Sequence, residues 1–227
     1  MKTIHPTAQI GPFCLIGENV SIGENSRIGA HSVIEEGASI GKNCHIDSFV
    51  QIRHNCNIKD HVSIRSKSVI GSEGFGYAQN QKFESTFIPQ LGAVTLSGPS
   101  VFGSFLNMDR GAFTDTSFAS NTILASRIHI AHNVHMEKNC RIRDGFMMAG
   151  STDMGEGFFA DVSCVVAGHM KIPHQVHLGV NTRLTTKTSP NSDYVGTPPM
   201  KPSLQNEVLK LFKEFHILLV EDSKEPK

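Results

Sequence analysis

The stretch "IGPFCLIGENVSIGENSRIGAHSVI", residues 10–34, carries isoleucine at every sixth position. The same spacing runs without a break from Ile4 to Ile70, through twelve isoleucines. An α-helix has about 3.6 residues per turn, so it cannot place every sixth residue on one face. A triangular prism can, because each hexad then supplies one side, as a short strand whose aliphatic residue points inward. The glycine that often follows the isoleucine is expected to serve a tight turn with an unusual φ angle.

The hexad pattern returns after an interruption and extends through most of the chain. Leu96, Phe102 and Met108 form one short run, and a second run extends from Phe118 to Leu184. In the second run Phe158 and Ala160 exchange the usual small and large positions, which conserves volume. Together the 27 hexads predict about nine coils of an all-β, parallel β-helix, with strands stacked about 4.8 Å apart.

The hexads also divide the chain. Residues 1–187 form the predicted β-helix, and residues 72–93 form a long excursion within it, of the kind that is often functional. Residues 188–202 are rich in Pro, Ser and Thr and are expected to be a linker. Residues 203–220 are predicted to be a short C-terminal α-helix, and residues 221–227 a disordered tail.

The predicted C-terminal helix has Ser203, after Pro202, as its expected N-cap. Apolar residues recur on it at helical spacing. They are Leu204, Val208, Leu211, Phe212, Phe215 and Leu219. We expect this apolar stripe to pack between subunits.

Composition excludes several classes of protein. Lys and Arg together number 21, as do Asp and Glu, so a basic field for nucleic acid is not expected. The N-terminus has no apolar signal region, and no apolar stretch is long enough to predict a membrane span. Five cysteines without a CxxC motif favour a cytoplasmic chain. All five precede an inward position by two residues, which predicts packing rather than catalysis or metal binding; they are Cys14, Cys44, Cys56, Cys140 and Cys164.

Three histidines stand close together in "RIHIAHNVHM", residues 127–136. His129 and His135 each precede an inward residue of consecutive hexads, so they belong to faces turned about 120° from each other, by the geometry of a three-sided coil. Because the ligands of one zinc ion must lie about 2 Å from it, these histidines are not expected to form a metal site within one subunit, and a site between subunits is left open. His132 is left at a turn, and Gly150 should lie one coil above it, about 4.8 Å away.

Several motifs occur in one order along the chain. They are "GSEGFGY" (71–77), "IPQLG" (88–92), "MDRGAFTDT" (108–116), "IAHNV" (130–134), "AGH" (167–169) and "YVGTPPMKP" (194–202). With the hexads, this set resembles the UDP-3-O-acylglucosamine N-acyltransferases of lipid A synthesis. The resemblance implies a left-handed parallel β-helix and a homotrimer. It also implies transfer of an acyl chain from the phosphopantetheine thioester of acyl carrier protein to the amine of a nucleotide amino sugar, with no bound cofactor.

The resemblance assigns roles to particular residues. His132 matches the catalytic general base of the family, a role that suits histidine because it titrates near neutral pH. Gly150 matches the residue whose backbone N–H stabilises the thioester oxyanion. Asn133 and His169 are expected to bind substrate. Asp109 and Arg110 of "MDRG" are expected to do so as well, with a structural salt bridge at a turn as the alternative.

Two features depart from the family pattern. The hexads begin at Ile4, so the uridine-binding domain that usually precedes them is not expected here, and the identity of the acceptor is left open. The acid that often stands seven residues before the catalytic histidine is replaced by Ala125. The sequence "HIAH" is more similar to that of the UDP-N-acetylglucosamine O-acyltransferases.

Three other functions remain open from the sequence. One is an acetyl-CoA-dependent sugar acetyltransferase. Another is a zinc lyase similar to the γ-class carbonic anhydrases, for which His169 and His174 have a compatible spacing but Asn133 stands where the third ligand is needed. The last is a non-catalytic paralogue, which the irregular second half and Ala125 favour.

Overall fold

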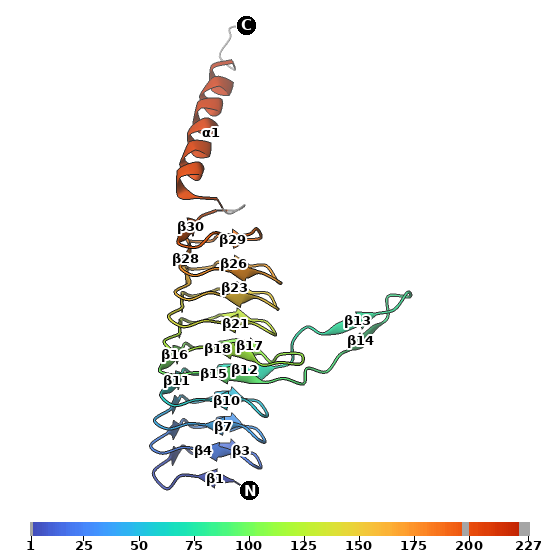
Figure 1. Ribbon diagram of the computed structural model, residues 1–227, viewed down its shortest axis with the longest axis vertical. Helices are drawn as coiled ribbons and strands as arrows, with labels where there is room; N and C mark the ends of the chain where they lie inside the picture. The colour runs from blue at the N-terminus through green and yellow to red at the C-terminus, as the bar shows by residue number, and fades with distance from the viewer. Residues whose placement is uncertain (1, 197–199, 223–227) are drawn as a thin grey trace.

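The computed structural model describes residues 2–196 and 200–222, with side chains described as far as residue 214. The chain winds into a three-sided column of parallel strands (Figure 1). Its three faces are sheets of nine, ten and nine strands, here called faces A, B and C. The predicted all-β class and the left-handed parallel β-helix of about nine coils are confirmed.

Each face takes every third strand of the column. Face A contains β1 (Thr3–Ile4), β4 (Ser21–Ile22), β7 (Ser39–Ile40), β10 (Asn57–Ile58), β15 (Val94–Leu96), β18 (Thr116–Phe118), β21 (His135–Met136), β24 (Asp153–Met154) and β27 (Lys171–Ile172). Face B contains β2 (Gln9–Ile10), β5 (Arg27–Ile28), β8 (His45–Ile46), β11 (Val62–Ile64), β16 (Ser100–Phe102), β19 (Ile123–Leu124), β22 (Arg141–Ile142), β25 (Phe159–Ala160), β28 (Val176–Leu178) and β30 (Ser192–Tyr194). Face C contains β3 (Leu15–Ile16), β6 (Val33–Ile34), β9 (Gln51–Ile52), β12 (Val69–Ser72), β17 (Asn107–Asp109), β20 (His129–Ile130), β23 (Met147–Met148), β26 (Val165–Val166) and β29 (Arg183–Leu184).

The inward residues form one continuous core. The isoleucines from Ile22 to Ile70 on the hexad spacing are at most 3% exposed. Ile4 and Ile10 are 39% and 38% exposed, because β1 and β2 are the end strands of their sheets and have no coil packed beneath them. Phe158 and Ala160 are both fully buried, which confirms the predicted exchange of volume.

Most glycines after the inward isoleucines have a different role from the predicted one; Gly71, with φ +90°, is the exception and has the predicted unusual φ angle. The left-handed φ angles occur at the corners of the coil, on residues such as Asn25 (φ 56°) and Asn43 (φ 53°), where asparagine is tolerated. Gly11 and Gly29 are needed instead for close approach between coils. A Cβ atom on Gly11 would lie 2.7 Å from the Ala30 nitrogen, and one on Gly29 would lie 2.3 Å from the Ser48 nitrogen.

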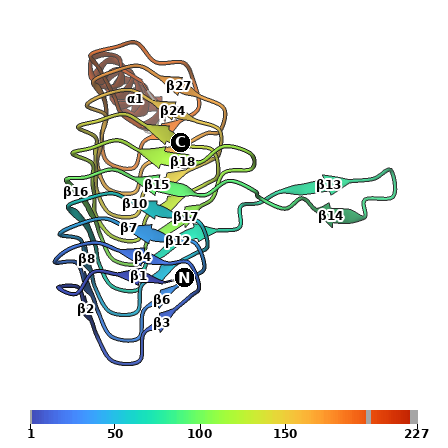
Figure 2. The same ribbon diagram turned by 60° about the horizontal axis from the view of Figure 1, so that its bottom comes forward.

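Two insertions interrupt the column. Partners in adjacent coils are normally separated by three hexads, as Thr3 and Ser21 are. Residues 72–93 leave the column after β12 and form an antiparallel hairpin of β13 (Tyr77–Gln79) and β14 (Ser85–Phe87), which projects far to one side in Figures 1 and 2. A shorter loop at residues 110–115 separates β17 from β18 and was not predicted.

The C-terminal segment differs in detail from its prediction. The proposed linker, residues 188–202, supplies β30, which extends face B beside β28. Helix α1 (Pro202–Asp222) begins one residue earlier than predicted. The Lys201 carbonyl accepts the Gln205 N–H at 3.0 Å, so Lys201 occupies the N-cap position and Pro202 the first helical position, where proline is favoured. The assignment of Ser203 as N-cap is wrong.

The predicted disordered tail begins inside the helix, since Glu221 and Asp222 are helical; residues 223–227 lie outside the described part of the chain. Leu204, Leu211 and Phe212 of the apolar stripe are more than half exposed, so packing between subunits stays a prediction. The side chains of Phe215 and Leu219 are outside the described set. Within the described residues, no helix combines the length and the apolar composition that a membrane span requires.

Candidate functional site

His132 stands at the corner between faces C and A, directly after β20. It lies between two glycines from distant parts of the chain. A Cβ atom on Gly74, at the base of the projecting excursion, would lie 3.0 Å from His132 Cβ. A Cβ atom on Gly150, one coil above, would lie 2.9 Å from both Cε1 and Nε2 of His132. The absence of side chains at both glycines therefore makes the room that the imidazole occupies.

The neighbouring Asn133 determines the tautomer of His132. Asn133 Oδ1 accepts the backbone N–H of Ala112 at 2.9 Å, which identifies this atom as the amide oxygen. The same oxygen lies 3.0 Å from His132 Nδ1, so Nδ1 must be the donor. In the neutral imidazole Nε2 then keeps its lone pair, and a Cβ atom on Gly150 would lie 2.9 Å from it. The geometry is that of a histidine prepared to accept a proton.

The loop at residues 110–115 holds Asn133 in place. Besides the Ala112 contact, Asn133 Nδ2 donates to Thr114 Oγ1 at 3.1 Å, and the Asn133 backbone N–H donates to Thr116 Oγ1 at 2.9 Å. With its amide engaged in this way, Asn133 orients His132. Its part in substrate binding stays a prediction.

Gly150 also offers a hydrogen-bond donor beside the imidazole. Its carbonyl accepts the His169 N–H at 2.9 Å, and the next residue, Ser151, donates to the His132 carbonyl at 2.9 Å. The described residues provide no acceptor for the Gly150 N–H itself. The predicted stacking of Gly150 over His132 is confirmed, and it leaves one free backbone donor near Nε2.

A buried carboxylate lies close to the histidines, on face C. Asp109 is 5% exposed and accepts a hydrogen bond from Ser72 Oγ at 2.8 Å and one from Asn107 Nδ2 at 2.9 Å. Its other oxygen lies 3.7 Å from His129 Nε2. Asp109 therefore belongs to a polar cluster with Ser72, Asn107 and His129 on face C.

Burial raises the pKa of the Asp109 carboxyl, although the Ser72 hydroxyl and the nearby His129 and His132 oppose this shift. The folded state therefore binds the Asp109 proton more tightly than the unfolded state does. The protonated Asp109 carboxyl therefore stabilises the fold at pH values below the ordinary aspartate pKa. This stabilisation is lost as the pH rises through the raised pKa of Asp109. In Asp109→Asn, whose amide is neutral throughout, we expect a smaller loss of stability between acidic and neutral pH.

Urea denaturation of both proteins at matched pH values measures this difference. The stability of the variant relative to the wild type should increase from acidic to neutral pH. A difference that is constant with pH would contradict the raised pKa of Asp109.

Arg110, predicted to bind substrate, is placed in the interior. It is 1% exposed, and its Nε donates to the Gly71 carbonyl at 2.9 Å while its Nη2 donates to the His54 carbonyl at 2.9 Å. Its Nη1 contacts His54 Nε2. The side chain thus fixes the base of the excursion to the coil below and is not accessible to a ligand. It forms no salt bridge with Asp109, so the alternative prediction for this pair is not met either.

The remaining histidines separate as the hexads predict. His129 lies on β20 of face C, whereas His135 lies on β21 of face A, where it contacts Ser117 Oγ at 2.9 Å. His169 is exposed, two coils beyond Asn133 at the same corner. Among the described residues, no three His, Cys, Asp or Glu side chains are grouped so as to hold a metal ion. The zinc-lyase alternative has no ligand set in this part of the chain.

The cysteines act as packing residues. Four of the five are buried and none forms a disulfide. Burial raises the pKa of the Cys140 thiol to about 11 and also raises the pKa of Cys44, Cys56 and Cys164. Thiols with raised pKa values are poor nucleophiles at neutral pH, which confirms their predicted structural role.

Two contributions to the site were not found from the sequence, namely Gly74 and the two hydrogen-bond partners of Asp109, Ser72 and Asn107; the part of Asp109 in substrate binding stays a prediction. The two insertions change the spacing between these residues, so the hexad pattern does not align them. Val69 pairs with Asn107 across the longer insertion, and Asn107 pairs with His129 across the shorter one, so both separations exceed the usual three hexads. If the lengths of the two insertions are subtracted from the spacing along the chain, Val69, Asn107 and His129 fall at the same position on face C.

Comparisons with known proteins agree with this architecture. Residues 2–36 and 37–72 match the bacterial transferase hexapeptide (six repeats) family. The chain is 33% identical over 132 residues to the UDP-3-O-acylglucosamine N-acyltransferase of Acidovorax sp. strain JS42, over 58% of this chain and 40% of that protein. It is 31% identical over 137 residues to the enzyme of the same name from Bordetella pertussis strain Tohama I, over 59% of this chain and 38% of that protein. The chain thus spans about two fifths of the length of these curated relatives.

Solved structures share the fold. The UDP-N-acetylglucosamine acyltransferase of Campylobacter jejuni superposes with a TM-score of 0.67 at 19% identity, over 88% of this chain and 73% of that one. The UDP-N-acetylglucosamine O-acyltransferase of Moraxella catarrhalis gives a TM-score of 0.64 at 20% identity, over 87% and 73%. At these identities the likeness establishes the fold alone. The sequence relatives confirm the resemblance predicted from the ordered motifs.

Proposed function

We propose that this chain, which carries transferase hexapeptide repeats and is related in sequence to UDP-3-O-acylglucosamine N-acyltransferases, is an N-acyltransferase with His132 as its general base. The donor is the phosphopantetheine thioester of acyl carrier protein, and the acceptor is the amine of a nucleotide amino sugar. One observation carries the assignment. Asn133 fixes the imidazole with Nδ1 as donor, so that Nε2 has its lone pair beside the open Gly150 backbone.

The reaction follows from these positions. The acceptor amine attacks the thioester carbonyl while Nε2 of His132 removes a proton from the amine nitrogen. The negative charge that develops on the carbonyl oxygen is stabilised by the free N–H of Gly150. Collapse of the tetrahedral intermediate breaks the C–S bond, and the protonated His132 returns its proton to the leaving thiolate. The products are an amide and the free phosphopantetheine thiol.

The polar cluster around Asp109 stabilises the state in which His132 is protonated. When His132 takes up the amine proton, the nearby carboxylate of Asp109 lies in a buried setting where charge interactions are strong. This makes Asp109 a positioning and electrostatic residue, since its oxygens are directed to Ser72, Asn107 and His129. His169, exposed at the same corner, is the residue available to contact the acceptor. We further propose a homotrimer in which the apolar stripe of α1 is covered.

The direct test is an assay of donors and acceptors read by mass spectrometry. We expect an amide product with an acyl carrier protein thioester and a nucleotide amino sugar. Product formed only from acetyl-CoA would favour the sugar acetyltransferase alternative. Ester product on an amino sugar hydroxyl would show O-transfer, and the absence of product with every donor would support a non-catalytic paralogue.

A further inference from the structure

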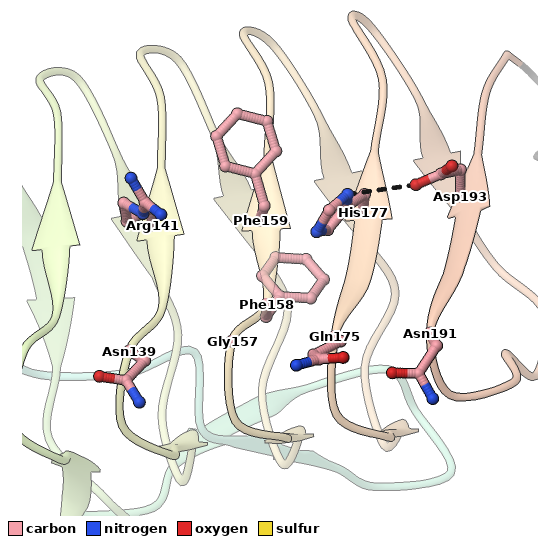
Figure 3. A pocket seen from close by; sticks show the side chains of 9 residues that line it. All are labelled: Asn139, Arg141, Gly157, Phe158, Phe159, Gln175, His177, Asn191 and Asp193. Carbon is pink, nitrogen blue, oxygen red and sulfur yellow. Dashed lines mark ion pairs between the residues drawn. The ribbon is translucent and has the colours of Figure 1, made fainter.

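A groove of about 690 Å³ lies on face B near the C-terminal end of the column (Figure 3). Its wall is a row of outward side chains on adjacent strands, and its edge is a row at the corner between faces A and B. The first row is Arg141, Phe159, His177 and Asp193, and the second is Asn139, Gly157, Gln175 and Asn191. His132 lies at the corner between faces C and A and is not among the lining residues.

The hollow exists because Gly157 interrupts a row of amides. Asn121 Nδ2 donates to Asn139 Oδ1 at 2.7 Å, which continues the row from one coil to the next. Gly157, the next member, has a φ angle of +72° and no side chain. A Cβ atom there would meet only the flexible Gln175 side chain, at 3.3 Å from its Cγ. The gap beside Phe159 is thus set by one residue and not by the backbone.

Arg141 brings an uncompensated positive charge to this gap. No hydrogen bond or ion pair engages its guanidinium within the described residues. Two acids of neighbouring coils have basic partners, because Asp161 binds Arg143 at 3.1 Å and Glu156 lies 3.5 Å from Lys138. The groove's own carboxylate, Asp193, lies at the opposite end of the row from Arg141 and faces His177. A guanidinium that presents a planar set of donors without a partner is suited to a phosphate or carboxylate group.

Phe159 provides an aromatic surface next to that charge. It is in register with Arg141 on one side and His177 on the other. Adjacent strands are about 4.8 Å apart, so the three side chains form a continuous strip. His177 meets the Phe159 ring edge-on, with centroids 5.7 Å apart, and its Nδ1 lies 3.1 Å from Asp193 Oδ1. This pair holds the imidazole in place at the far end of the strip.

We infer that this groove binds a phosphate ester of a ring compound, with the phosphate on Arg141 and the ring against Phe159. A sugar phosphate and a nucleotide share this chemistry, since both combine an anionic group with a ring whose flat face can stack on an aromatic side chain. The exposed amides of Gln175 and Asn191 are placed to hydrogen-bond to ring substituents. The inference does not depend on the proposed role of His132, because the groove is on another face.

Ligand-observed NMR titrations with the full chain test the inference. The probes are glucose 1-phosphate, uridine 5′-diphosphate, inorganic phosphate and unphosphorylated glucose. We expect at least one ester to bind more tightly than inorganic phosphate or glucose, and the two esters distinguish a sugar phosphate site from a nucleotide site. Arg141→Ala should weaken that binding by about tenfold or more, as expected for loss of a charged hydrogen-bond donor.

Matched variants separate binding from folding. Arg27→Ala removes an exposed arginine from β5 of the same face, where the flanking outward residues are Gln9 and His45, and it should leave binding unchanged. Gly157→Asn fills the notch with a residue that tolerates positive φ, so it should abolish binding while the thermal midpoint is retained. The inference is wrong if Arg141→Ala and Arg27→Ala bind alike, if neither ester binds, or if inorganic phosphate binds as tightly as both esters.

Discussion

Replacing His132 by alanine is expected to reduce acyl transfer by about a thousandfold, within the range that general acid–base catalysis supplies. In the proposed mechanism Nε2 takes the proton of the acceptor amine, since Nδ1 faces Asn133 Oδ1. The variant should keep its fold, because the His132 side chain is partly exposed and is not part of the apolar core. Initial rates with saturating donor and acceptor measure the effect on kcat.

His135→Ala is the matched control for this experiment. His135 is on the next strand, but it is directed outward on face A toward Ser117. Its replacement should leave kcat within about twofold of the wild type, as for a surface change away from the site. Retention of full activity in His132→Ala, with far-ultraviolet circular dichroism unchanged, would exclude the proposed mechanism.

Arg110→Ala is expected to lower the free energy of unfolding by about 3 kcal/mol or more. The substitution leaves the Gly71 and His54 carbonyls without their donor in the interior, and it removes a large buried side chain. Because these carbonyls join the base of the excursion to the coil below, the loop at residues 72–93 should also become sensitive to proteolysis. Urea denaturation and limited digestion measure the two effects.

Arg27→Ala again supplies the comparison, because Arg27 is exposed on face B and no hydrogen bond of its side chain occurs within the described residues. Its stability should change by no more than about 0.5 kcal/mol. If Arg110→Ala were equally mild, with the excursion as resistant as in the wild type, the buried guanidinium would have no structural role.

Much of the site was predictable because the repeat converts sequence distance into spatial distance. His132 and Gly150 are separated by three hexads, which make one coil, and the structure places them in contact. The separation of His129 from His135 followed from the same count. The cysteines were assigned to packing because each occupies the same position of its hexad. The positions of these residues follow from the six-residue period alone and do not depend on how the loops fold.

The hexad period does not encode the contacts between neighbouring coils. The glycines after the inward isoleucines were assigned to turns with unusual φ, which holds for Gly71, but those such as Gly11 and Gly29 are required because the next coil passes too close for a Cβ atom. Asn133 was assigned to substrate binding, which stays a prediction, and the contacts of its amide with the loop at residues 110–115 were not foreseen. Arg110 was assigned to the same role and is buried. In each case the decisive neighbour comes from another coil.

The sequence by itself determined the three-sided column, the inward residues and the position of His132, because one side-chain period repeated many times assigns each residue to a side or a corner of the coil. The tertiary structure alone decided what surrounds His132. Two insertions, at residues 72–93 and 110–115, shift the register by amounts that the hexads do not encode. They bring Gly74 against the imidazole, Ala112 to Asn133 and Asp109 beside His129. Such contacts depend on how a loop folds back, which is set by packing between segments and not by the repeat.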